Sequence, residues 1–178
     1  MPLSVLLLTA ANSERHITGA SRDKVTVGSL QPGELVLCFD KLDTVDIVRL
    51  GLGIPRNQKC CDGIIYYANR VLKVICLVEM KHSRLDSAAE QIKRTYEHLY
   101  QRLKSECKGC EEIFQQIVWR AYVYRTGSST VDTEECKKLL RDKFGPENIR
   151  VSSNPDILGF LRGENDTVRR KGFQKGKR

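Results

Sequence analysis

Three charged residues with a definite spacing are the part of the sequence best suited to chemistry. Asp62 stands before one apolar run, and Glu79-Met80-Lys81 closes a second run after sixteen intervening residues. Because side chains alternate between the faces of a strand, Glu79 and Lys81 are expected to point to the same side. Charges at one end of an apolar hairpin are normally paired with one another or hold a metal ion. The pattern therefore indicates an ion-pair network or a metal site.

The two apolar runs predict the β-hairpin that would position these charges. Residues 63–67 and 71–78 are rich in β-branched and aromatic side chains, and a short break at Asn69 separates them. Asn tolerates the left-handed backbone that a tight reversal needs. In such a hairpin the start of the first strand lies beside the end of the second. Asp62 is therefore expected at the same edge as the other two charges.

Apolar spacing elsewhere predicts the other elements of an α/β domain. Residues 12–33 have the composition of a polar loop, and the spacing over 34–50 favours one helix or two short ones. A strong amphipathic helix is expected from about Leu85 to Lys104. Further elements are a strand at 117–124, a helix from Asp132 or Thr133 through Phe144, and short strands at 149–151 and 157–161. This order predicts a central mixed sheet flanked by helices.

Length and charge predict one domain with a basic tail. A chain of 178 residues is long enough for one real core, which we expect over residues 1–165. The net charge of +8 is concentrated at the end, because residues 1–168 together carry only +2. We expect residues 166–178 to be a disordered tail that attracts phosphate. The candidate nucleic-acid contacts in this tail are Arg169, Arg170, Lys171, Lys175, Lys177 and Arg178.

Cysteine usage and hydropathy predict a cytoplasmic protein. The seven cysteines are an odd number, and several lie in apolar runs where a free thiol behaves as a small hydrophobe, so a reducing cytosol is the simplest setting. No apolar stretch approaches the roughly 20 residues of a membrane-spanning helix. One alternative is a four-thiolate zinc or iron–sulfur site made by Cys60, Cys61, Cys107 and Cys110. The adjacent pair Cys60-Cys61 is poor geometry for one tetrahedral ion.

The three charged residues and their surroundings resemble a known superfamily. Asp62, then Glu79-x-Lys81 at the end of an apolar strand, then an amphipathic helix and another strand, is similar to the PD-(D/E)XK phosphodiesterases over about residues 34–125. The resemblance implies a restriction-endonuclease-like fold. It also implies that Asp62, Glu79 and the backbone carbonyl of Met80 hold Mg²⁺ or Mn²⁺, while Lys81 orients or activates the attacking water. Hard oxygen ligands suit Mg²⁺, and a metal at a phosphate supplies charge neutralisation and an activated water.

Other residues match the superfamily in part. Gln91, ten residues after Lys81, resembles the helix-borne Gln of the RecB-like branch, where a Tyr usually follows four residues later. Here Thr95 holds that place and Tyr96 comes next, and Cys61 stands where the motif name has Pro. An acidic residue from the helix before the hairpin often completes the metal site in this superfamily. The candidates are Glu34, Asp40, Asp43 and Asp46.

These observations predict a metal-dependent endonuclease-type phosphodiesterase. The resemblance implies DNA rather than RNA as the substrate, and a homodimer by analogy with the superfamily. The alternative is a non-catalytic module that binds nucleic acid or a partner protein through the tail and the same scaffold. A cysteine-metal protein is the third interpretation.

Overall fold

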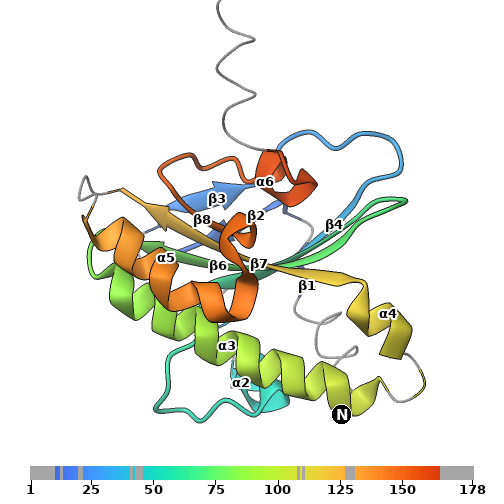
Figure 1. Ribbon diagram of the computed structural model, residues 1–178, viewed down its shortest axis with the longest axis horizontal. Coiled ribbons are helices and arrows are strands. Elements are labelled where there is room, and N and C mark those ends of the chain that lie inside the picture. The colour runs from blue at the N-terminus through green and yellow to red at the C-terminus, as the bar shows by residue number, and fades with distance from the viewer. Residues whose placement is uncertain are drawn as a thin grey trace, which may run out of the picture.

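A mixed six-stranded sheet forms the centre of the molecule (Figure 1). The computed structural model describes residues 11–12, 14–19, 22–40, 42, 46–107, 109, 111–126 and 131–164. In sheet order the strands are β1 (Ala11–Asn12), β4 (Leu35–Phe39), β5 (Gly63–Ala68), β6 (Lys73–Lys81), β7 (Ile117–Arg125) and β8 (Ile149–Ser152). In the series β1, β4, β5 and β6, each strand pairs antiparallel with the next one in the series. Strand β7 pairs parallel with β6, and β8 pairs parallel with β7. The predicted α/β class with a central mixed sheet is confirmed.

The β5–β6 hairpin has the reversal that the sequence predicts. The Asn69 side chain accepts hydrogen bonds from the backbone N–H groups of Val71 and Leu72 at 2.9 and 2.8 Å. The Asn69 N–H in turn donates to the Leu72 carbonyl. An Asn side chain that satisfies the backbone in this way is a common means of closing a tight turn.

Helices cover one face of the sheet (Figure 1). The long helix α3 (Leu85–Glu106) connects β6 to the parallel strand β7, and α5 (Val131–Phe144) connects β7 to β8. Parallel neighbours need such crossover connections. Helix α3 buries Ala88, Ala89, Ile92 and Leu99 in the same core as strand residues such as Leu77. The short helices α2 (Asp46–Leu52) and α4 (Glu111–Gln115) complete this side of the molecule.

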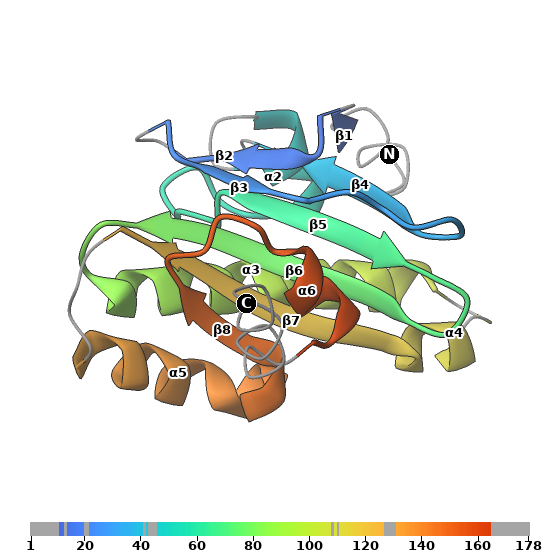
Figure 2. The same ribbon diagram turned by 90° about the horizontal axis from the view of Figure 1, so that it is seen from above.

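The opposite face is covered mainly by a small second sheet. Strands β2 (His16–Thr18) and β3 (Lys24–Thr26) form an antiparallel hairpin, and β2 packs against β4 and β5 (Figure 2). Helix α6 (Leu158–Arg162) and the 3-10 turn at Pro146–Asn148 close the rest. The second core joins Ile17 and Val25 of this hairpin and Leu161 of α6 to Cys76 and Val78 of β6.

Three predictions of local structure were wrong. The segment 34–50 contains strand β4 at Leu35–Phe39 before the helix α2, because five consecutive apolar residues fit a buried strand as well as a helix. The segment 12–33 contains β2 and β3, each of which buries a single β-branched residue. The segment 157–161 is helix α6 and not a strand.

None of the helices in the described ranges combines the length and apolar character needed to cross a bilayer.

Candidate active site

The hairpin register brings Asp62 and Glu79 together. Gly63 pairs with Val78, so that Asp62 lies opposite Glu79 at the edge where β6 ends. The Asp62 N–H donates to Glu79 Oε2 at 3.0 Å. The Met80 N–H donates to Asp62 Oδ2 at 2.8 Å. The Asp62 carboxylate is therefore held by the backbone of β6, and the Glu79 carboxylate is held by the backbone of Asp62.

Lys81 is the third member of this group. Its Nζ lies 2.7 Å from Glu79 Oε1, and the two side chains are 24% and 1% exposed. The Thr126 N–H donates to the Lys81 carbonyl at 3.4 Å, which continues the pairing of β6 with β7 past the ends of both strands. The group is therefore open to solvent at the lysine and closed at Glu79.

The electrostatics of the group favour an added cation. Burial, and secondly the negative charge of Asp62, raise the pKa of Glu79 to about 8, while the Lys81 ammonium opposes the shift. With both acids ionised, two negative charges face one positive charge in a largely buried place. A divalent cation would reverse this imbalance and replace the proton that Glu79 otherwise tends to hold.

The available donors fit a hard divalent ion. Asp62 and Glu79 supply carboxylate oxygens. In a β-strand the N–H and C=O of the same residue point to the same side. The Met80 N–H points to Asp62, so the Met80 carbonyl faces the same side. Within the described ranges no three or more His, Cys, Asp or Glu side chains cluster around a possible metal position. Mg²⁺ commonly binds through one or two carboxylates and retains several waters. The donor set therefore suits such an ion and not an all-side-chain cage.

Thr95 is a positioning residue that sequence reasoning missed. Its hydroxyl accepts the Cys61 N–H at 2.9 Å and donates to the Gln91 carbonyl at 2.8 Å. This contact fixes the residue directly before Asp62 to helix α3. Gln91 itself lies on the buried side of α3, one turn before Thr95. The available signal was a threonine on the apolar stripe of the predicted helix, between Ile92 and Leu99.

Of the four candidates for an additional acid, the two whose side chains the structure describes, Glu34 and Asp40, lie away from the site. Glu34 precedes Leu35, which pairs with Ala68, so that Glu34 lies at the opposite end of the sheet, where Arg162 binds it. Asp40 accepts the N–H of Thr18 at 2.8 Å and so turns to the face covered by the β2–β3 hairpin. Asp43 and the side chain of Asp46 lie outside the described part of the chain.

The four cysteines do not form one thiolate site. Cys60 and Cys61 are buried in the helix-side core, and burial raises the pKa of the Cys61 thiol. Cys107 comes twelve residues after Thr95, which contacts Cys61, and this length of helix spans about 18 Å. Cys107 is therefore too far from the first pair to share an ion with it. Cys110 lies outside the described residues.

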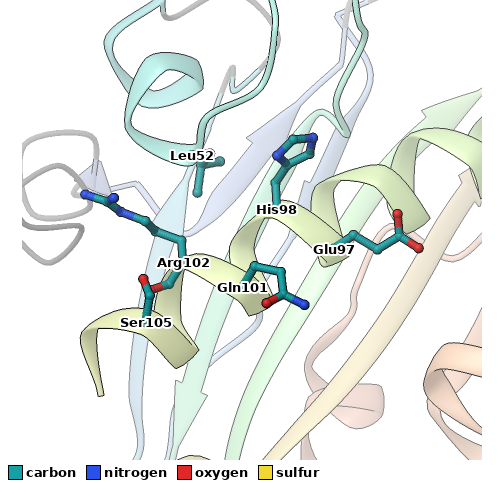
Figure 3. A pocket seen from close by; sticks show the side chains of 6 residues that line it. All are labelled: Leu52, Glu97, His98, Gln101, Arg102 and Ser105. Carbon is teal, nitrogen blue, oxygen red and sulfur yellow. The ribbon is translucent and has the colours of Figure 1, made fainter. Parts of the chain in front are cut away.

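The described surface has pockets away from the candidate site. A pocket of about 430 Å³ runs along the second half of α3, where Leu52 of α2 faces His98, Arg102 and Ser105 (Figure 3). It contains none of the three charged residues of the candidate site. The six basic residues predicted to bind nucleic acid, Arg169, Arg170, Lys171, Lys175, Lys177 and Arg178, fall outside the described residues.

Comparison with known proteins adds no relative. No family model, curated protein or solved structure matches this chain.

Proposed function

We propose that this chain is a metal-dependent nuclease of the PD-(D/E)XK superfamily, with a restriction-endonuclease-like fold. The proposed reaction is hydrolysis of a phosphodiester bond in DNA rather than RNA. Mg²⁺ or Mn²⁺ is the proposed cofactor, and Asp62, Glu79 and the Met80 carbonyl are its proposed ligands. The observation that carries the proposal is the convergence of two carboxylates and one ammonium at the end of β6.

Each side chain has a distinct proposed role. When bound, the divalent ion supplies charge neutralisation at the phosphate and an activated water. Glu79 is fixed on both oxygens, by the Asp62 N–H and by Lys81. The Lys81 side chain is partly exposed to solvent, so that its ammonium orients the attacking water. Thr95 acts indirectly, because it holds the backbone next to Asp62.

A cleavage assay with matched variants tests this function. We expect purified protein with Mg²⁺ or Mn²⁺ to cut DNA, across a panel of linear, circular, single-stranded and branched substrates. Lys81→Ala and Glu79→Gln should each lower the cleavage rate by at least about a hundredfold. Arg70→Ala, an exposed change at the far end of the β5–β6 hairpin, should have no effect. Equal activity of the wild type and Lys81→Ala would indicate contamination and remove the proposal.

A non-catalytic binding module is the second candidate. The Glu79–Lys81 contact of 2.7 Å supports it, because the same ion pair could serve only to neutralise a buried acid. Binding of DNA without cleavage under every divalent metal, unchanged by Glu79→Ala, would favour this function.

A homodimer is proposed by analogy alone, and sedimentation at several protein concentrations would measure it.

A further inference from the structure

Arg49 is a buried cation on helix α2 that binds the backbone of the segment after this helix. Its Nη2 donates to the carbonyl oxygens of Pro55 at 2.8 Å and Arg56 at 3.0 Å, and also to the carbonyl of Gln58. A guanidinium group taken out of water needs hydrogen bonds that offset its lost hydration. These three acceptors all belong to the connector, which we define as residues 55–59.

A second arginine holds the last residue of the connector. Nη1 of Arg94, on helix α3, donates to the Lys59 carbonyl at 3.0 Å. The neighbouring Thr95 accepts the N–H of Cys61 at 2.9 Å. Side chains of two helices therefore hold the backbone along this whole path, up to the residue directly before Asp62.

The connector has little apolar packing of its own. Residues 55–57 and 59 are exposed and Gln58 is half-buried, whereas the buried side chains of Ile54 and Cys60 lie just outside the connector. A segment with few buried apolar contacts opens easily. The two guanidinium groups therefore supply contacts that the side chains of the connector do not supply.

The connector leads to a carboxylate whose position depends on direct hydrogen bonds. Asp62 Oδ2 accepts the Met80 N–H at 2.8 Å, and the Asp62 carbonyl accepts the Leu42 N–H at 3.1 Å. A hydrogen bond of this length is lost when its acceptor moves away by about 1 Å. A shift of the connector that reaches Asp62 would therefore separate its carboxylate from the Met80 N–H.

We propose that Arg49 and Arg94 are positioning residues for Asp62, which act through the backbone carbonyls of the connector. Arginine suits this role because its planar group carries several N–H donors and stays ionised. The inference rests on the proposed nuclease function, in which Asp62 is a metal ligand. It extends the support of that ligand from the β5–β6 hairpin to helix α2.

Amide hydrogen exchange at Met80 measures the position of Asp62 directly. The Asp62 carboxylate accepts the Met80 N–H, so exchange at this amide becomes faster when the carboxylate moves away. Val74, in the middle of the β5–β6 pairing, is the reference amide for unfolding of the whole sheet. Both amides are followed by NMR in the full-length chain, without metal and without DNA.

Arg49→Met and Arg94→Met are the test variants, because methionine keeps an unbranched side chain and removes the donors. Lys93→Met is the matched control. Lys93 is the residue before Arg94 on α3, but its Nζ contacts Asp142 of α5 at 3.5 Å and not the connector.

We expect each arginine variant to speed exchange at Met80 at least about tenfold and to leave exchange at Val74 unchanged. Lys93→Met should change neither rate. Arg94 is only half-buried, so its variant decides the result if Arg49→Met does not fold. Unchanged exchange at Met80 in a folded arginine variant, or equal acceleration at Met80 and Val74, overturns the inference.

DNA cleavage by the same proteins separates this inference from the proposed function. Faster Met80 exchange in the variants, together with a wild type that cuts DNA under no divalent metal, supports the positioning role and removes the nuclease. A wild type that cuts, together with wild-type exchange at Met80 in the variants, removes the positioning role alone. If both stand, each arginine variant should need about tenfold more Mn²⁺ than the wild type for half-maximal cleavage.

Discussion

At the scale of single residues, the site depends on backbone hydrogen bonds to its acids. Asp62 and Glu79 each accept an N–H from the strand of the other, and Lys81 contacts Glu79 at 2.7 Å. Such charge-assisted bonds hold a carboxylate in one orientation. The proposed metal ligands are therefore already held in place without an ion, which would lower the cost of binding one.

Replacing Thr95 tests how far this arrangement depends on helix α3. Thr95→Val keeps the shape and removes the acceptor for the buried Cys61 N–H. We expect the free energy of unfolding to fall by about 1–3 kcal/mol, which chemical denaturation would measure. We also expect the cleavage rate at saturating DNA to fall more than the affinity for DNA, because Asp62 shifts.

Thr95→Ser is the control for this variant. It retains the hydroxyl, so that both the cleavage rate and its dependence on metal concentration should return to wild-type values. A Val variant that is less stable but cuts DNA at the wild-type rate would contradict the positioning role of Thr95.

At the scale of elements, the β2–β3 hairpin is fitted closely onto β5. A Cβ atom on Gly63 would lie 2.5 Å from Cγ2 of Ile17, so only glycine fits next to this side chain. Gly63→Ala should therefore lower the free energy of unfolding by about 1–3 kcal/mol. In an Ile17→Ala background the same change should cost little, since the clash is gone. A double-mutant cycle by denaturation measures the coupling, and additive effects would contradict the contact.

The link between β4 and α6 predicts a pH dependence of stability. Glu34 is only 7% exposed and binds Arg162 through both oxygens, at 2.7 and 2.8 Å. Hydrogen bonding to Arg162 is the main cause that lowers the pKa of Glu34 from 4.5 to about 2, against the effect of burial. Because the folded pKa is the lower one, this stabilisation is complete above about pH 4.5 and is lost as the pH falls toward 2.

Glu34→Gln should remove this dependence. At pH 7 we expect the variant to lose about 2–3 kcal/mol of unfolding free energy, and at low pH its stability should approach that of the wild type. Denaturation at a series of pH values measures the difference. A constant difference between the two proteins from pH 7 down to pH 2 would contradict the ion pair.

The sequence was sufficient for the central elements and not for the periphery. The β5–β6 hairpin and α3 are long, regular and flanked by clear turn residues, so their periodicity determines them. Strand β4 has five apolar residues in succession, a pattern that has no clear period. The strands β2 and β3 are three residues long, and tertiary packing of Ile17 and Val25 decides their structure. The pairing of Asp62 with Glu79 was predictable because it follows from the hairpin, whereas the Asp23–His82 contact joins two turns that no local pattern connects.

At the scale of the whole molecule, charge predicts a role for the end of the chain. Residues 166–178 hold the six basic residues Arg169, Arg170, Lys171, Lys175, Lys177 and Arg178. Removing this segment should weaken DNA binding and lower the salt slope by as much as about five, while the melting temperature stays the same. Replacing the six residues with Gln should have the same effect. Unchanged affinity after deletion would assign DNA binding to the folded part of the chain alone.

The location of a bound manganese ion tests the central claim most directly. Crystals of the protein soaked in Mn²⁺ can be measured near the absorption edge of the metal, where an anomalous peak identifies the ion. We predict one peak within about 2–2.5 Å of oxygens from Asp62, Glu79 and the Met80 carbonyl, absent in Glu79→Gln. A fully soaked crystal with no peak between these residues, or with its peak elsewhere on the chain, would contradict the account.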